Sequence, residues 1–286
     1  MSVKVWIDGR LVEKEQAKIS VFDHGLLYGD GVFEGIRVYN GRLFEWDAHI
    51  RRLFDSAKST RLAIPNTPAQ IKTIVEETIR ANGFTDCYIR LIVTRGIGAL
   101  GVNPASCSNP STIVIADKIE MYSRDVCEKG MSLITASVIR NHPSALSPRI
   151  KSLNYLNNIL AKLEALDAGV AEAIMLNGQG NVAECTADNI YIVRDGTVLT
   201  PTSSDGILEG ITRKVIFTLC DKMGIPMREQ TIQRHDLYIA EECFISGTGA
   251  EIAPVVRIDG RNIGAAEPGP ITKRIMDAFH RHVREA

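Results

Sequence analysis

Alternating apolar and polar positions open the chain and predict two β-hairpins. VWID and RLV flank Asp8-Gly9, while GVFEGIRVY and RLFE flank Asn40-Gly41. Such residue pairs supply the positive φ angles that a two-residue primed turn requires. The apolar period then becomes helical over 47–60 and 68–82, with Gly83 as a natural stop, and two more strands follow, CYIRLIVT and STIVIA.

A polar, irregular stretch at 119–129 predicts an interdomain linker. We therefore expect a small domain over 1–118 and a larger one over 130–286. In the larger domain, Ser152 is expected to cap a helix that buries a leucine- and isoleucine-rich face and stops at Gly169. The remaining elements expected there are the strands SLITASVI, EAIML, NIYIV, TVLT, PMREQTI and CFISG, a helix from Thr212, and a last helix with Ile271, Ile275, Phe279 and Val283 facing inward.

Composition excludes several classes of protein. Hydrophobic residues make up 45% and charged residues 23%, and the formal net charge is -1. These are ordinary globular values, and the scattered basic residues argue against nucleic-acid binding. No apolar run approaches the roughly 18 residues that span a bilayer, and the start has no signal-peptide core. The six cysteines form no CxxC pair, so we expect no disulfide framework and no metal site, and a cytoplasmic protein.

The sequence GIGALG, with Gly96, Gly98 and Gly101, matches the glycine pattern of dinucleotide-binding proteins. That pattern must open a helix whose N-terminus holds the pyrophosphate. Here VNPASCSNPS follows, and Pro104 and Pro110 block a helix. We therefore interpret the segment as a flexible glycine loop and expect no bound dinucleotide.

Lys151 and Glu184 are candidate catalytic residues. Lys151 follows a proline-marked loop and precedes the helix attributed to Ser152, where the positive helix end would favour the neutral amine that attacks aldehydes. Glu184 stands in NVAECTADN, which has the composition of a polar turn between strands. Taken singly, an exposed lysine and a loop carboxylate are equally good interpretations.

Two further segments suit an anion. Gly210 precedes a helix whose first amides, those of Ile211 and Thr212, are able to bind phosphate without a side chain. SGTGAEIAP, at 246–254, is a tight turn of small residues that offers amides and the Thr248 hydroxyl. Alone, each is also typical of an ordinary helix cap or turn.

These segments occur together with YGDGVFEGIRVYNG, HIRRLFDSA, CYIR, IKSLNYL, ECTADNIYIV and ILEGITRK. In this combination the chain resembles the fold-type-IV pyridoxal-phosphate enzymes, in particular the branched-chain amino acid aminotransferases, over nearly its whole length. The stretch from Glu184 through Thr200 to Arg213 fits the family signature in residue type and spacing. The resemblance implies an α+β fold with a small N-terminal α/β sandwich-like domain, a larger C-terminal pseudo-barrel domain, and the cofactor between them.

The resemblance also implies roles for individual residues. Lys151 would be the Schiff-base lysine, and Glu184 would pair with the cofactor's pyridine nitrogen. Tyr155 would bond the 3-hydroxyl, one helical turn from Lys151, and Arg52 would hold the phosphate. The other implied residues are Ile211, Thr212 and Thr248 for the phosphate, and Tyr28, Phe33, Tyr88, Arg90 and Gly249 for the substrate, with Tyr28 and the loop around Val102 reaching the partner subunit's site.

The implied reaction is a ping-pong transamination between L-leucine, L-isoleucine or L-valine and 2-oxoglutarate, which yields branched 2-oxo acids and L-glutamate. Amino acids and 2-oxo acids are then the partners, in a homodimer or higher homo-oligomer with active sites at the subunit interface. D-amino acid aminotransferases and aminodeoxychorismate lyases share the lysine, the glutamate and the phosphate-binding residues, and they remain alternatives because YGDGVF and TRG also occur in D-specific relatives. A non-catalytic binding protein is a further alternative, against which the presence of Lys151, Glu184, Arg52 and Thr248 argues.

Overall fold

The computed structural model describes residues 2–285, except for the side chains of Arg124 and Cys127. The chain divides into two compact units, Met1–Ile119 with Ile150–Asn154, and Glu120–Arg149 with Tyr155–Ala286. Within the described residues, no helix combines the length and apolar character needed to cross a membrane.

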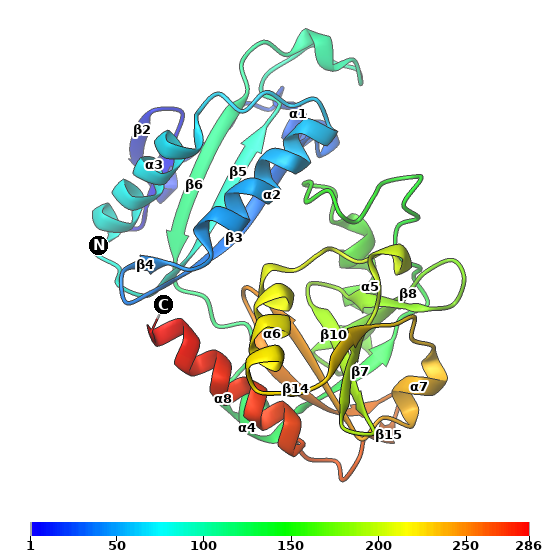
Figure 1. Ribbon diagram of the computed structural model, residues 1–286. Coiled ribbons are helices and arrows are strands. Elements are labelled where there is room, and N and C mark those ends of the chain that lie inside the picture. The colour runs from blue at the N-terminus through cyan, green and yellow to red at the C-terminus, as the bar shows by residue number, and fades with distance from the viewer. Residues whose placement is uncertain (1, 286) are drawn as a thin grey trace. The chain divides into compact units, whose positions relative to one another are not determined.

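The first unit contains a six-stranded antiparallel sheet with the strand order β2-β1-β6-β5-β3-β4 (Figure 1). Its strands are β1 (Lys4–Ile7), β2 (Arg10–Glu13), β3 (Gly31–Tyr39), β4 (Arg42–Leu43), β5 (Cys87–Thr94) and β6 (Ser111–Asp117). Its helices are α1 (His24–Tyr28), α2 (Trp46–Ser59) and α3 (Pro68–Asn82), with short 3-10 turns at Lys14–Gln16 and Pro104–Ser106.

Local signals explain several of these elements. Asp8 and Gly9, and Asn40 and Gly41, all have positive φ, which confirms the two predicted hairpin turns. Helix α3 has the predicted bounds because Thr67 and Gln70 form a capping box, Pro68 stands in its first turn, and Gly83 ends it in the left-handed conformation.

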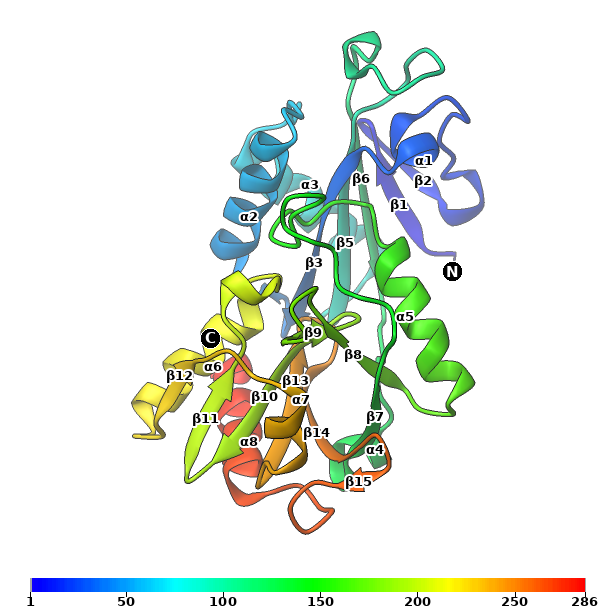
Figure 2. The same ribbon diagram turned by 90° about the vertical axis from the view of Figure 1, so that its right-hand side faces the viewer.

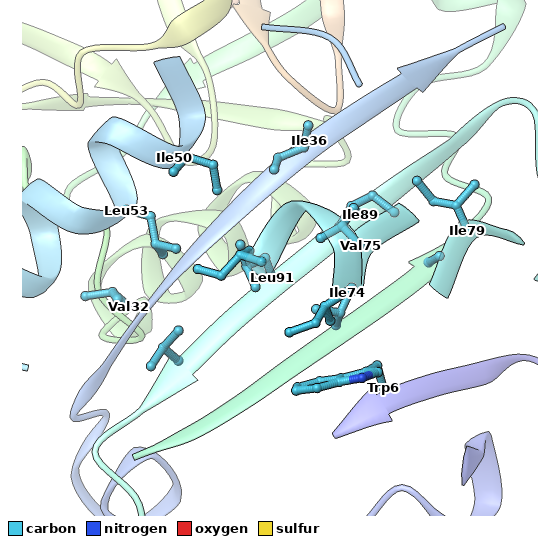
Figure 3. Packing of buried hydrophobic residues seen from close by; sticks show 14 of the residues in the cluster. Trp6, Val32, Ile36, Ile50, Leu53, Ile74, Val75, Ile79, Ile89 and Leu91 are labelled. Atoms are coloured by element: carbon cyan, nitrogen blue, oxygen red, sulfur yellow. The ribbon is translucent and has the colours of Figure 1, made fainter. Parts of the chain in front are cut away.

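One face of the first unit's sheet packs against α2 and α3. Figure 3 shows Val32 and Ile36 of β3 on this side of the sheet, together with Ile50 and Leu53 of α2. Ile89 and Leu91 of β5, and Ile74, Val75 and Ile79 of α3, extend the same core (Figure 3). Since side chains alternate along a strand, the intervening residues of β3 and β5 point to the opposite face.

The second unit contains a nine-stranded mixed sheet with the order β12-β11-β10-β13-β14-β7-β8-β9, and β15 pairs with β14. Its strands are β7 (Met131–Thr135), β8 (Glu172–Leu176), β9 (Val182–Cys185), β10 (Asn189–Arg194), β11 (Thr197–Thr200), β12 (Met227–Glu229), β13 (Glu242–Gly247), β14 (Glu251–Ile258) and β15 (Arg261–Asn262). Its helices are α4 (Arg124–Lys129), α5 (Leu156–Asp167), α6 (Ile211–Lys222), α7 (Arg234–Tyr238) and α8 (Pro270–Glu285), with a 3-10 turn at Ser203–Asp205.

This sheet curls on itself. Strand β9 is the last strand in the hydrogen-bonded order, yet it also contacts β10 in the middle of the sheet. A tight turn joins β9 to β10, and Cys185 N–H donates a hydrogen bond to the Asp188 carbonyl across this turn. Helices α6 and α8 pack side by side against β13, and α5 packs on β8 (Figure 2). The predicted α+β fold with a barrel-like second half is therefore confirmed.

Two predictions about elements were wrong. Helix α4 lies within the stretch expected to be irregular, while the interdomain role of this stretch and the domain bounds stay predictions. Ser152 caps no helix: α5 begins at Leu156 after Tyr155, and the Ser152 hydroxyl accepts a hydrogen bond from Asn154 N–H instead.

The buried face of α5 also differs from the prediction. Asn158, Ala161 and Ala165 are buried, and the two alanines pack against Ala173 and Met175 of β8. Small side chains let the helix approach the sheet closely. The leucine- and isoleucine-rich face is exposed: Leu156, Ile159, Leu160, Leu163 and Leu166.

Enlarging the buried face of α5 tests this orientation. Ala161→Leu inserts a large side chain where no exposed surface exists, and it should lower the free energy of unfolding by about 1–3 kcal/mol. The matched change Ala168→Leu, at an exposed position near the end of the same helix, should stay within about 0.5 kcal/mol of wild type. Equal effects of the two changes in denaturant titrations would contradict the orientation.

Candidate active site

Lys151 lies along β3 in the first unit. Lys151 C=O accepts a hydrogen bond from Phe33 N–H at 3.0 Å, Leu153 N–H bonds Gly31 C=O at 2.9 Å, and Lys151 N–H bonds the Ser56 hydroxyl at 3.1 Å. The backbone around the lysine is therefore held by a strand and by α2, not by a helix of its own. The predicted helix starting at Ser152, and the shared helical face of Lys151 and Tyr155, were wrong because α5 starts only at Leu156.

Lys151 and Arg90 share one aromatic neighbour. Lys151 Nζ lies 4.7 Å from the centroid of the Phe33 ring, and the Arg90 guanidinium carbon lies 4.6 Å from the same centroid. Arg90 is also 5.5 Å from the Tyr88 ring. A Cβ at Gly35, the residue paired with Arg90 across the strands, would collide with the Tyr88 hydroxyl, so a larger residue there would displace the Tyr88 side chain. The face of β3 and β5 opposite the core thus brings four predicted residues together.

Arg52 faces a carboxylate that the sequence analysis missed. Its Nε and Nη2 atoms donate to the two oxygens of Glu34 at 2.7 and 2.8 Å, and His49 Nδ1 lies 2.7 Å from Glu34 Oε2. The signal for such a partner was a charged residue among the inward positions of β3, which are otherwise apolar.

Tyr28 lies in the last turn of α1 and is partly exposed. Its hydroxyl accepts a hydrogen bond from Gly101 N–H at 2.7 Å, so the structure joins Tyr28 to the glycine loop that precedes Val102. Val102 is 82% exposed. The loop contains a short 3-10 turn at Pro104–Ser106 and no α-helix, as expected for a segment that is not a dinucleotide-binding turn.

Glu184 is a buried residue of β9 in the second unit, and the prediction that it lies in a polar turn was wrong. Its Oε1 accepts a hydrogen bond from Arg140 Nε at 3.0 Å, and its Oε2 accepts from Leu208 N–H at 2.9 Å and Asn189 Nδ2 at 3.3 Å. Arg140 is itself buried. These donors suit a carboxylate and hold the Glu184 side chain in one orientation in the second unit.

Helix α6 begins at Ile211, with Thr212 next and Gly210 as its N-cap, and no side chain caps it. Since the first amides of a helix have no partner within it, this end suits an anion. A Cβ at position 210 would collide with Asn189 Oδ1. Asn189, which also bonds Glu184 and the Leu208 carbonyl, therefore ties the start of α6 to Glu184.

The other predicted residues of the second unit lie near strand and helix ends. Thr248 and Gly249 form the tight turn between β13 and β14, both half-buried. Asn189 pairs with Ser246 at the end of β13, next to this turn. Tyr155 is the residue before α5 and is half-buried. The described part of the chain holds no group of three or more metal-ligating side chains.

Comparison with known proteins identifies the family of the chain. The family model for class IV aminotransferases matches residues 31–258. The branched-chain-amino-acid aminotransferase of Escherichia coli K12 is 37% identical over 281 residues, which cover 96% of this chain and 91% of the relative. The chain belongs to the class IV aminotransferases.

Solved structures of this aminotransferase family superpose closely on the chain. The branched-chain aminotransferase of Thermoproteus uzoniensis with norvaline is 40% identical, with a TM-score of 0.93, covering 100% of this chain and 96% of that one. The branched-chain amino acid aminotransferase of Thermobaculum terrenum, in its holo-form with pyridoxal phosphate, is 30% identical, with a TM-score of 0.89, covering 99% and 94%.

Asp188, in the turn between β9 and β10 of this aminotransferase, is a second buried acid that the sequence analysis did not single out. Burial, and then the neighbouring Glu172 carboxylate, raise the pKa of Asp188 to about 7 from its ordinary value of 3.8, against the lowering effect of the hydrogen bond from Tyr122. Between these two pKa values the folded chain binds more protons than the unfolded chain. The free energy of unfolding therefore falls as pH rises through this window.

Asp188→Asn should abolish the fall in the free energy of unfolding that accompanies ionisation of Asp188 in this pH window. The variant should gain stability over wild type between about pH 4 and about pH 7, by on the order of a few kcal/mol, because the asparagine does not ionise. Thermal melts at several pH values measure the difference. Asp167→Asn, at an exposed end of α5, serves as the control and should show no comparable pH dependence. A stability difference between Asp188→Asn and wild type that does not change with pH would contradict the assignment.

Proposed function

We propose that the protein is a pyridoxal 5'-phosphate-dependent transaminase that exchanges amino groups between L-leucine, L-isoleucine or L-valine and 2-oxoglutarate. The observation that carries the proposal is the pair of basic side chains, Lys151 and Arg90, at 4.7 and 4.6 Å from the centroid of one Phe33 ring. An amine nucleophile, a carboxylate-binding guanidinium and an apolar ring are the three groups that an apolar amino acid requires. The named activities of the relatives support the same substrates.

The residues present fit the cofactor. A phosphate suits the uncapped start of α6, and the buried Glu184 carboxylate suits a protonated pyridine nitrogen. When bound, the cofactor supplies a ring that accepts electrons from the substrate's α-carbon. We propose Lys151 as its covalent anchor, Glu184 for the pyridine nitrogen, Tyr155 for the 3-hydroxyl, and Arg52, Ile211, Thr212 and Thr248 for the phosphate.

Each residue then has a defined task in the reaction. Glu184 holds the proton on the pyridine nitrogen, and Arg140 and Asn189 keep the Glu184 carboxylate oriented and ionised. With the cofactor bound, the amine of Lys151 would be the base that takes the proton from the substrate α-carbon and then the acid that returns a proton. Its anchored backbone limits where Nζ reaches.

The proposed substrate-binding residues form two groups, one for carboxylate groups and one for the aliphatic side chain. Arg90 and Tyr88, with the amides at Gly249, suit carboxylate groups, while Phe33 packs the aliphatic side chain. Tyr28 and the loop at Val102 are proposed to reach the partner subunit's site. Such a division lets one site take both a branched aliphatic substrate and 2-oxoglutarate. We further propose a cytoplasmic location, which the five unbridged cysteines of the described residues suit.

A cofactor and handedness assay tests this function. Loaded with pyridoxal phosphate, the wild type should show a visible absorption band that Lys151→Ala abolishes. It should form L-glutamate from L-leucine and 2-oxoglutarate, because the proposed residues serve L substrates. D-glutamate from D-alanine would point instead to a D-amino acid aminotransferase, and pyruvate formed from aminodeoxychorismate without an amino acceptor to the lyase. No band in the wild type would overturn the enzyme proposal itself.

We propose that a second copy of the chain covers the exposed stripe of α5. Five large apolar side chains lie along one side of this helix, with exposures between 46% for Leu160 and 67% for Leu156. An apolar patch of this size on a helix otherwise packed through alanines is typical of an association surface. A homo-oligomer is also required if Tyr28 and the loop at Val102 reach a partner subunit's site.

A charge placed in this stripe should separate the subunits. Leu163→Glu puts a carboxylate at its centre, where burial against a partner is unfavourable. Light scattering during size-exclusion chromatography should give a multimer for wild type and a smaller species for the variant. Ala168→Glu, an exposed residue at the helix end, should keep the wild-type mass. A wild-type monomer, or an unchanged mass for Leu163→Glu, would contradict the proposal.

A further inference from the structure

Glu34 is a charged residue among the apolar core residues of the first unit. It lies on the face of β3 that also carries Val32 and Ile36, which lie beside α2 with Ile50 and Leu53 (Figure 3). Glu34 has no exposed surface. A buried carboxylate is costly unless it is paired and hydrogen-bonded, so its partners should account for its presence.

The partners of Glu34 come from a single face of α2. Arg52 donates from Nε to Oε1 at 2.7 Å and from Nη2 to Oε2 at 2.8 Å, which is a bidentate pairing. His49, three residues earlier and therefore on the same side of the helix, lies with Nδ1 at 2.7 Å from Oε2. Two of the three guanidinium nitrogens of Arg52 are thereby fixed, so the plane of the guanidinium is fixed as well.

The charges in this cluster balance. Burial alone would raise the pKa of Glu34, but the Arg52 charge and the hydrogen bonds from Arg52 and His49 hold it at about 2. Burial lowers the pKa of His49. An ionised carboxylate only accepts hydrogen bonds, so the neutral His49 ring carries its proton on Nδ1. The cluster contains one negative and one positive charge.

We propose that Glu34 is a positioning residue that orients the Arg52 guanidinium for a phosphate group. The proposal rests on the phosphate role of Arg52 proposed above. Glu34 adds no positive charge, so its contribution is geometric: a long, flexible side chain is held in one direction before the anion arrives. If Glu34 only neutralised the charge of Arg52, loss of the hydrogen bonds between Glu34 and Arg52 would strengthen phosphate binding.

A comparison of two cofactor forms isolates the contribution of the phosphate group to cofactor binding. Apo-protein is titrated with pyridoxal 5'-phosphate and with pyridoxal, which lacks the phosphate, and the ratio of the Kd of pyridoxal to that of the phosphate form is compared among variants. Glu34→Asp keeps the charge but withdraws the carboxylate by one methylene. The ratio should fall by about tenfold, because a charge-assisted hydrogen bond to the phosphate is misdirected, while the Kd of pyridoxal changes by less than about twofold.

Three further proteins complete the test. Arg52→Met should lower the ratio by itself, and Glu34→Asp combined with Arg52→Met should lower it no further, since Glu34 acts through Arg52. The matched control is Asp30→Glu, which alters another bidentate pair of the first unit, Asp30 with Arg95, and should leave the ratio unchanged. Thermal melts establish that each variant is folded, and Glu34→Gln replaces Glu34→Asp if the latter is not.

The outcomes distinguish the two proposals. A ratio that is unchanged or raised in Glu34→Asp, together with a fall in Arg52→Met, would overturn the positioning role and leave the phosphate role of Arg52 intact. A ratio unchanged in Arg52→Met would overturn the phosphate role, and the positioning role with it. A wild type that binds neither cofactor form would contradict the proposed function.

Discussion

The alternation of side chains along β3 is the constraint on which the first unit depends. Successive residues of a strand point to opposite faces of the sheet. Val32 and Ile36 therefore enter the core with α2 and α3, while Phe33 faces the other way and meets Lys151 and Arg90. The same strand binds the Lys151 backbone along its edge. One face of β3 therefore contributes to the core, and the other face lies beside the candidate nucleophile. A shift of one residue in the register of β3 would exchange the two faces.

In each unit, a buried carboxylate is paired with an arginine. Glu34 is held by Arg52 and His49 in the first unit, and Glu184 by Arg140, Asn189 and a backbone amide in the second. Such pairs contribute little net stability, because desolvation offsets most of the attraction. Their value is orientation: each holds a charged group in one place, as a cofactor that is bound through its phosphate and its ring nitrogen requires.

Features with local causes were predicted well from the sequence. The turns at Asp8-Gly9 and Asn40-Gly41, and helix α3 with its Thr67 cap, are encoded by neighbouring residues, and the structure has them as expected. The α+β fold and the family followed from the combination of segments. The failures had tertiary causes. The leucines of α5 favoured a buried apolar face, but the helix packs on β8 through alanines, and Glu184 was taken for a turn residue although β9 buries it. The partners Arg140 and Glu34 were missed because they lie 44 and 18 residues from the side chains they hold.

Chemical trapping tests whether Lys151 carries the cofactor covalently. The protein would be loaded with pyridoxal phosphate, reduced with borohydride, digested, and mapped by mass spectrometry. We expect the phosphopyridoxyl group on Lys151, in the peptide containing IKSLNYL. Stoichiometric modification of a different lysine, or a loaded and reduced protein that carries no such group, would contradict it.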